Sequence, residues 1–227
     1  PSCQGEIALS RHAWLSEFRL FDFGLLPPAA VFEFATAAAS ELLGSAAFSL
    51  HDLSLRDCLR LPADGVVTLQ AVLSEDREGR HVLQVFSRES GSEANGVEVA
   101  WCLRATAEVV REAGAEARIA LPVQAADAPQ MEVDRFFKAL GTRGAELGPA
   151  FRGLTDIRSA GGLVTARVRL PAALSGSSSS FVLHPALLES ALLLAEVAVP
   201  GRADAADGFL LPGHATEYRV WQAGVDA

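Results

Sequence analysis

The stretch PAAVFEFATAAASELL, residues 28–43, decides the fold that we predict for this chain. Pro28 stands where the first turn of a helix tolerates proline. The residues after it are apolar on nearly every side of a helix rather than along one stripe, as in a helix that protein surrounds. The stretch therefore predicts a central helix with a sheet curled around it.

A second segment of the same kind is PALLESALLLAEVA, residues 185–198, which opens with Pro185. Elsewhere, alternating apolar and polar residues predict strands, several of them joined by glycine-bearing turns that favour an antiparallel sheet. The predicted strands are 66–73, 81–87, 97–109 and 163–169. We expect an α+β fold of two similar halves, each with several strands and one buried helix.

The stretch 112–130 is rich in alanine and proline and has no sustained period, which is typical of a connecting segment. We place an N-terminal half at residues 1–113, a linker at 114–130 and a C-terminal half at 131–227. The run SGSSSS at residues 175–180 predicts a flexible loop just before the second helix.

The composition limits the function classes. The 227 residues carry a net charge of −9, which argues against nucleic acid or an anionic membrane surface as partner. No apolar run approaches the roughly 20 residues of a membrane-spanning helix, and no signal peptide opens the chain, so we expect a cytoplasmic location. Three cysteines without metal-ligand spacing fit reduced thiols. Nucleotide-binding and zinc-hydrolase motifs do not occur, so we expect no cofactor and no catalytic metal.

Four stretches, RHAWLSEF with a later proline, WCLRATAEV, LGPAFRGL and LHPALLES, occur in this order along the chain. Together they resemble the dehydratase domains of modular polyketide synthases, which have a double hotdog fold. The resemblance implies a β-hydroxyacyl thioester, carried on the phosphopantetheine arm of an acyl carrier protein, from which water is eliminated. It further implies adjacent synthase domains as partners and additional strands beyond both ends, and it leaves a homodimer open.

Elimination needs a base beside the thioester carbonyl and an acid at the departing hydroxyl. In the family these are the histidine of H-x-x-x-G-x-x-x-x-P and the aspartate of H-P-A-L-L-D. Here Pro27 matches the proline of the first motif, which puts Asp22 at the glycine and Phe18 at the histidine. The second motif matches from His184 onward, with Glu189 in place of the aspartate. The resemblance thus implies a lost base and one retained carboxylate.

The same resemblance implies a pocket with fewer polar groups than usual. Leu147 stands where a tyrosine is frequent, and Leu193 where many members carry a polar side chain. Glu189 is the catalytic candidate. The residues expected to bind substrate are Phe18, Leu26, Pro27, Leu147, Gly148, Pro149, Phe151, His184, Pro185 and Leu193. His184, directly before the helix proline, is explained more simply as a capping residue than as a catalyst.

Several functions stay open. A degenerate dehydratase kept for architecture would use Phe18 as a core aromatic. Alternatively, Glu189 in an apolar pocket would have a raised pKa and act as a base in double-bond isomerisation, epimerisation or closure of an oxygen ring. A third interpretation keeps dehydration with a base from elsewhere, for which His51, His81 and His214 are poor candidates.

A pure interaction module, which binds a carrier protein without an acyl chain, is the remaining interpretation. An open apolar channel lined by Phe18, Leu26, Leu147 and Glu189 would favour acyl binding. A channel plugged by Phe18 would favour a scaffold. His12 does not fit the first motif, because counting from it puts Ser16 and Phe21 at the glycine and proline positions.

Overall fold

The structure is a computed structural model, which describes residues 1–90, 100–111, 128–199, 202 and 208–221. Its largest sheet is antiparallel. In spatial order its strands are β1 (Ser2–Ile7), β5 (Val66–Glu75), β6 (His81–Ser90), β7 (Cys102–Arg111), β4 (Phe48–Leu55) and β12 (His214–Tyr218). The strands predicted at 66–73 and 81–87 are confirmed, and the one predicted at 97–109 begins at Cys102 within the described residues.

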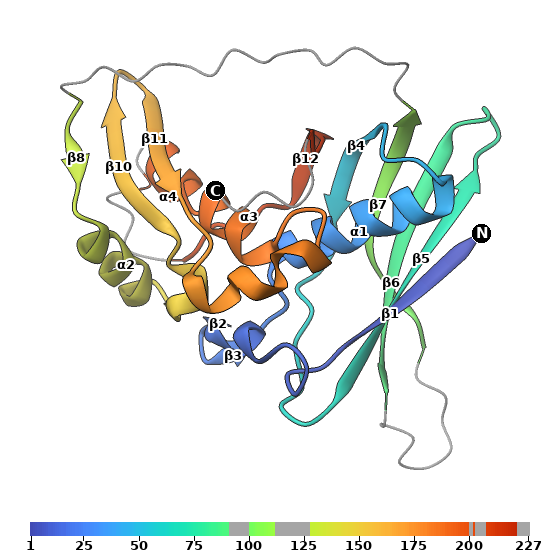
Figure 1. Cartoon of the computed structure of the whole chain (residues 1–227), viewed down its shortest axis with the longest axis horizontal. Helices are drawn as coiled ribbons and strands as arrows, with labels where there is room; N and C mark the ends of the chain where they lie inside the picture. The colour runs from blue at the N-terminus through green and yellow to red at the C-terminus, as the bar shows by residue number, and fades with distance from the viewer. Residues whose placement is uncertain (91–99, 112–127, 200–201, 203–207, 222–227) are drawn as a thin grey trace.

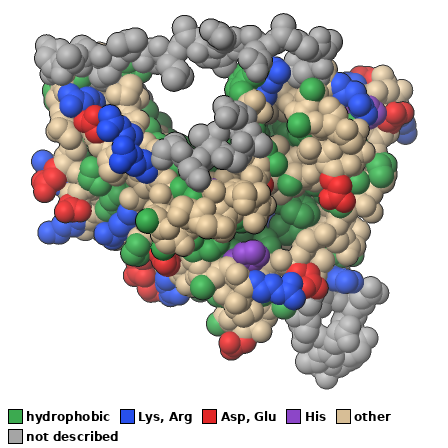
Figure 2. Space-filling view, viewed as in Figure 1, with side chains coloured by type: hydrophobic (Ala, Val, Ile, Leu, Met, Phe, Trp, Pro, Cys, Tyr) green, Lys and Arg blue, Asp and Glu red, His purple; other side chains and the backbone are tan. Residues whose placement is uncertain are grey.

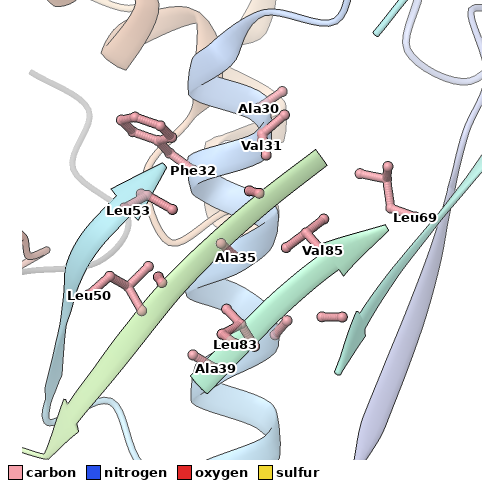
Figure 3. Packing of buried hydrophobic residues seen from close by; sticks show 14 of the residues in the cluster. Ala30, Val31, Phe32, Ala35, Ala39, Leu50, Leu53, Leu69, Leu83 and Val85 are labelled. Carbon is pink, nitrogen blue, oxygen red and sulfur yellow. The ribbon is translucent and has the colours of Figure 1, made fainter. Parts of the chain in front are cut away.

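Helix α1 (Pro28–Leu43) lies against this sheet and contacts β1, β4, β5 and β6 (Figure 1). Its bounds confirm the helix predicted over 28–43. It ends at Gly44, whose φ of 63° lies in the left-handed region that glycine adopts without strain. Figure 3 shows Ala35 and Ala39 of the helix beside leucine and valine side chains of the strands. Because both alanines are 0% exposed, their small side chains set the close approach of helix and sheet.

The other elements belong to two three-stranded sheets and a set of helices. One sheet joins β3 (Phe23–Gly24), β2 (Phe18–Leu20) and β9 (Ala145–Leu147), and the other joins β11 (Leu163–Val168), β10 (Leu154–Ala160) and β8 (Gln130–Met131). The helices are η1 (Ala13–Glu17), α2 (Val133–Thr142), η2 (Pro149–Phe151), η3 (Ala172–Ser180), α3 (Pro185–Leu192) and α4 (Ala195–Ala198). The strand predicted at 163–169 is confirmed.

The two central helices, α1 and α3, contact each other in the middle of the molecule (Figure 1). Strand pairs also join early and late parts of the chain, since β12 pairs with β4 and β2 pairs with β9. Residues 112–127 of the predicted linker lie outside the described residues. The division at 113 and 131 therefore stays a prediction.

The single helix predicted over 185–198 is wrong in its second part. α3 ends at Leu192, and after two turn residues α4 covers Ala195–Ala198. In this turn the amides of Leu194 and Glu196 bond to carbonyls three residues back rather than four, which tightens the backbone. The tightening accompanies the burial of Glu196, whose carboxylate binds Arg143 at 2.8 Å and Arg202 at 2.9 Å.

The flexible loop predicted at 175–180 is also wrong. These residues belong to the 3-10 helix η3. The hydroxyls of Ser175, Ser177 and Ser178 each donate to the carbonyl oxygen three residues back, at 2.7–3.0 Å. Serine side chains therefore reinforce a helical turn here, which composition alone could not reveal.

Within the described residues, no single helix has the length and apolar character to cross a membrane. One pair of segments, η3 and the stretch Pro185–Ala198, has the required length and apolar character only when the two are counted together across a sharp bend.

We expect Ala35→Leu to lower the free energy of unfolding by about 1–3 kcal/mol, because the larger side chain has no room between α1 and the sheet. Urea denaturation followed by circular dichroism measures this change. Glu41→Leu, at an exposed position of the same helix, is the matched control and should leave stability nearly unchanged. Equal effects of the two variants would contradict the close helix–sheet contact.

Candidate active site

Phe18, which the sequence motif assigns to the position of the family histidine, is a packed aromatic residue. It begins β2, pairs with Leu147 of β9 and is 0% exposed. Its ring meets the ring of Phe151 edge-on, with centroids 5.2 Å apart. A phenyl ring has no atom that accepts or delivers a proton. At this position the side chain can therefore pack but cannot catalyse proton transfer.

Glu189 is the buried carboxylate of α3, and its side chain points to the start of α1. It is 1% exposed, and its Oε2 accepts a hydrogen bond from the backbone N–H of Ala29 at 3.0 Å. Burial raises the pKa of Glu189 to about 7, although the Ala29 amide lowers it in part. A carboxyl group with this pKa exchanges protons readily near neutral pH.

Glu33 of α1 forms the reverse contact. Its Oε1 accepts from the amide of Val182 at 2.7 Å and its Oε2 from that of Leu183 at 2.9 Å, just before α3 begins. We call Glu33 and Glu189 the crossed carboxylate pair, because each helix supplies a carboxylate to the N-terminal end of the other. Sequence reasoning missed Glu33. The available signal was a single acidic residue within the otherwise apolar first half of this helix.

The other residues predicted to bind substrate do not line one common pocket in the structure. A cavity of about 170 Å³ contains Phe18 and Leu26 in its wall, but neither Leu147 nor Glu189. Pro28, Val31 and Cys58 also line it, and sequence reasoning did not select them. Of the four residues predicted to line one open channel, only Phe18 and Leu26 line this cavity.

Leu147 and Gly148 line a separate groove beside α2. Gly148 is required there, because a Cβ atom would lie 2.5 Å from Oε2 of Glu17, which accepts from the Ala150 amide. Phe151 and Leu193 are buried in a hydrophobic cluster that also contains Phe18. Pro27 is buried just before α1, whereas Pro149 is exposed.

His184 caps α3. Its Nδ1 accepts from the backbone N–H of Ala186 at 3.1 Å, and its ring lies between Trp14, with centroids 5.0 Å apart, and Phe181, at 4.6 Å. This geometry agrees with the capping role predicted from the position before Pro185.

All five histidines of the chain lie within the described residues, and none forms a hydrogen bond or an ion pair with Glu189 there. His51 contacts Ser49 at 2.9 Å, His81 lies 3.8 Å from Glu75, and His214 lies 3.4 Å from Asp52. His12 is half-buried at the start of η1. In the described part of the chain, no three His, Cys, Asp or Glu residues are grouped so that they could hold a metal ion.

Comparison with known proteins gives the family. A family model described as polyketide synthase dehydratase domain matches residues 1–88, and one described as polyketide synthase dehydratase N-terminal domain matches residues 111–227. The chain belongs to the polyketide synthase dehydratase family. This dehydratase-family domain is 33% identical to polyketide synthase GfsE of Streptomyces halstedii over 86% of its own length, which is 5% of the length of that synthase. The region that it matches is a small part of a much longer protein.

Solved structures confirm the double hotdog fold of this dehydratase-family domain. The bifunctional dehydratase-cyclase domain in ambruticin biosynthesis matches with a TM-score of 0.79 and 30% identity, over 99% of this chain and 76% of that one. An inactive mutant of the CurK dehydratase, in which a histidine is replaced by phenylalanine, matches with a TM-score of 0.80 and 22% identity, over 98% of this chain and 79% of that one.

The raised pKa of Glu189 predicts how stability depends on pH. Because the folded-state pKa of about 7 lies above the ordinary value of 4.5, ionisation costs stability as the pH rises from 4.5 towards 7. Between pH 4.5 and pH 8, we expect the parent protein to lose about 3 kcal/mol of unfolding free energy relative to Glu189→Gln, which cannot ionise. Denaturant titrations of both proteins at both pH values measure the difference.

Glu41→Gln, on the exposed side of α1, is the control for this pH experiment and should keep the parental pH dependence. If Glu189→Gln keeps it as well, the carboxyl group of Glu189 ionises normally and the prediction is wrong.

Proposed function

We propose that this chain is a dehydratase-like domain of a modular polyketide synthase that does not perform ordinary dehydration of β-hydroxyacyl thioesters. The single observation that carries the proposal is the burial of Phe18 against Phe151 at the position of the family histidine. General-base catalysis typically contributes 10²–10⁴ in rate, or about 3–5.5 kcal/mol, and a phenyl ring contributes none of it. The CurK dehydratase mutant, which is inactive with phenylalanine in place of a histidine, supports the same conclusion.

In this proposal the domain has an architectural role. The double hotdog is retained with well-packed cores on both sides of the crossed carboxylate pair. Adjacent synthase domains, an acyl carrier protein and a second copy in a homodimer are the proposed partners. A cytoplasmic location accords with a role in such a synthase.

A second candidate function is proton transfer without water loss, with Glu189 as the base. The pKa of about 7 favours it, and the relative from ambruticin biosynthesis is a bifunctional dehydratase-cyclase. Isomerisation of a double bond, epimerisation and closure of an oxygen ring are the reactions that one base can catalyse. Glu189 does not line the cavity beside Phe18, however, and its Oε2 is already bonded to Ala29.

The test supplies β-hydroxyacyl and enoyl thioesters on a carrier protein and follows water loss by mass spectrometry and deuterium exchange next to the carbonyl. We expect neither, because Phe18 supplies no base and Glu189 does not line the cavity beside it. Water loss at the rate of active relatives would overturn the proposal. Exchange without water loss that disappears in Glu189→Gln but persists in Glu41→Gln would favour the second candidate.

A gain-of-function variant tests the role of Phe18 directly. We expect Phe18→His combined with Glu189→Asp to lose water faster than the parent domain, by at least about tenfold, because the pair supplies both a base and a short acid. Phe18→Leu combined with Glu189→Asp is the matched control without an imidazole. Equal rates of the two double variants would mean that position 18 does not control the chemistry.

A further inference from the structure

A second cavity, separate from the one beside Phe18, lies between the loop after β1, one side of α1 and the end of η3. Its volume is about 220 Å³. Figure 2 shows hydrophobic side chains lining a hollow near the middle of this face of the molecule. The lining residues are Ile7, His12, Trp14, Leu15, Leu26, Ala30, Glu33, Phe34, Ala37, Ser180, Phe181 and Pro185. We call this cavity the Glu33 pocket.

Glu33 brings a buried carboxyl group to this pocket; burial raises its pKa, and the amides of Leu183 and Val182 lower it in part. The residue is 6% exposed, and its hydrogen-bond partners are two neutral backbone amides. Among the described residues, no lysine, arginine or histidine forms an ion pair with it. Its charge also reaches Tyr218, where burial first and Glu33 second raise the pKa of the phenol far above its ordinary value. Buried carboxylates usually have a cationic partner, so an unpaired one beside a cavity favours a cationic ligand.

The pocket walls fit the same kind of ligand. Trp14, Phe34 and Phe181 contribute three aromatic rings, and rings of this kind attract ammonium groups through their negative faces. The volume also limits the size, since an engineered cavity of about 150 Å³ holds benzene. A cavity of about 220 Å³ has room for one ring with a short polar substituent.

We propose that the Glu33 pocket binds a small ammonium compound with an aromatic or alicyclic body, with its charge near the Glu33 carboxylate and its ring among the aromatic side chains. The pocket is distinct from the cavity beside Phe18. It nevertheless shares Leu26 with the cavity beside Phe18, and Trp14 contacts Phe151, with ring centroids 5.8 Å apart.

Benzylammonium chloride is the probe, and benzyl alcohol and benzoate are its neutral and anionic analogues. Calorimetric titration of the whole domain should show benzylammonium binding on the order of tenfold tighter than benzyl alcohol, with benzoate weakest. Glu33→Gln, which removes the charge and keeps one of the two acceptor oxygens, should abolish the preference for the cation. Equal binding of the three compounds, or an unchanged preference in Glu33→Gln, would overturn the proposal.

A second pair of variants locates the site even if Glu33→Gln does not fold. Ala37→Phe fills the Glu33 pocket from its half-buried wall on α1, whereas Cys58→Phe fills the cavity beside Phe18 from an exposed position. We expect only Ala37→Phe to remove benzylammonium binding. Fluorescence of Trp14, in a background with Trp101→Phe and Trp221→Phe, should change on binding. Loss of binding in Cys58→Phe alone would place the ligand in the other cavity and refute the assignment.

Discussion

The crossed carboxylate pair is the constraint on which the arrangement of the two central helices depends. Glu33 holds the backbone before α3, and Glu189 holds the first turn of α1. The Glu189 bond satisfies an amide in the first turn of α1 that lacks an intrahelical partner, at a helix end where the dipole favours negative charge. The Glu33 bonds hold the two residues that precede the cap of α3. Three hydrogen bonds thereby fix the ends of both helices against each other, with no cationic side chain involved among the described residues.

This arrangement also limits what Glu189 can do. One of its oxygens accepts the bond from the first turn of α1, so the carboxylate predicted to be the catalytic candidate has a structural role. Burial raises the pKa of Glu189 to about 7, a value that suits a general base near neutral pH. The side chain does not, however, line the cavity that contains Phe18. Phe18 in turn contributes apolar packing with Phe151 instead of a titratable ring. Phe18 and Glu189 therefore both make contacts that stabilise the fold.

Aromatic packing links the two cavities of the domain. Phe18 meets Phe151, Phe151 meets Trp14, and Trp14 meets His184 and Phe181. Dense packing of this kind transmits small displacements, because interiors have few voids to absorb them. A ligand beside Trp14 would therefore act on the same group of rings that includes Phe18.

Local signals in the sequence were enough to predict the central helix, three of the six strands of the large sheet and the position of Glu189 on the second helix. These signals are a proline at the first helical turn, alternation of apolar and polar residues, and a short motif. Tertiary structure decided the rest. Glu33 meets Val182 across 149 residues, and β12 joins β4 from a distant part of the chain. The burial that raises the pKa of Glu189 and the separation of Leu147 from the cavity beside Phe18 both arise from contacts between segments that are distant in the chain. Such contacts leave no periodic trace in the sequence, because they depend on which surfaces meet after the elements form.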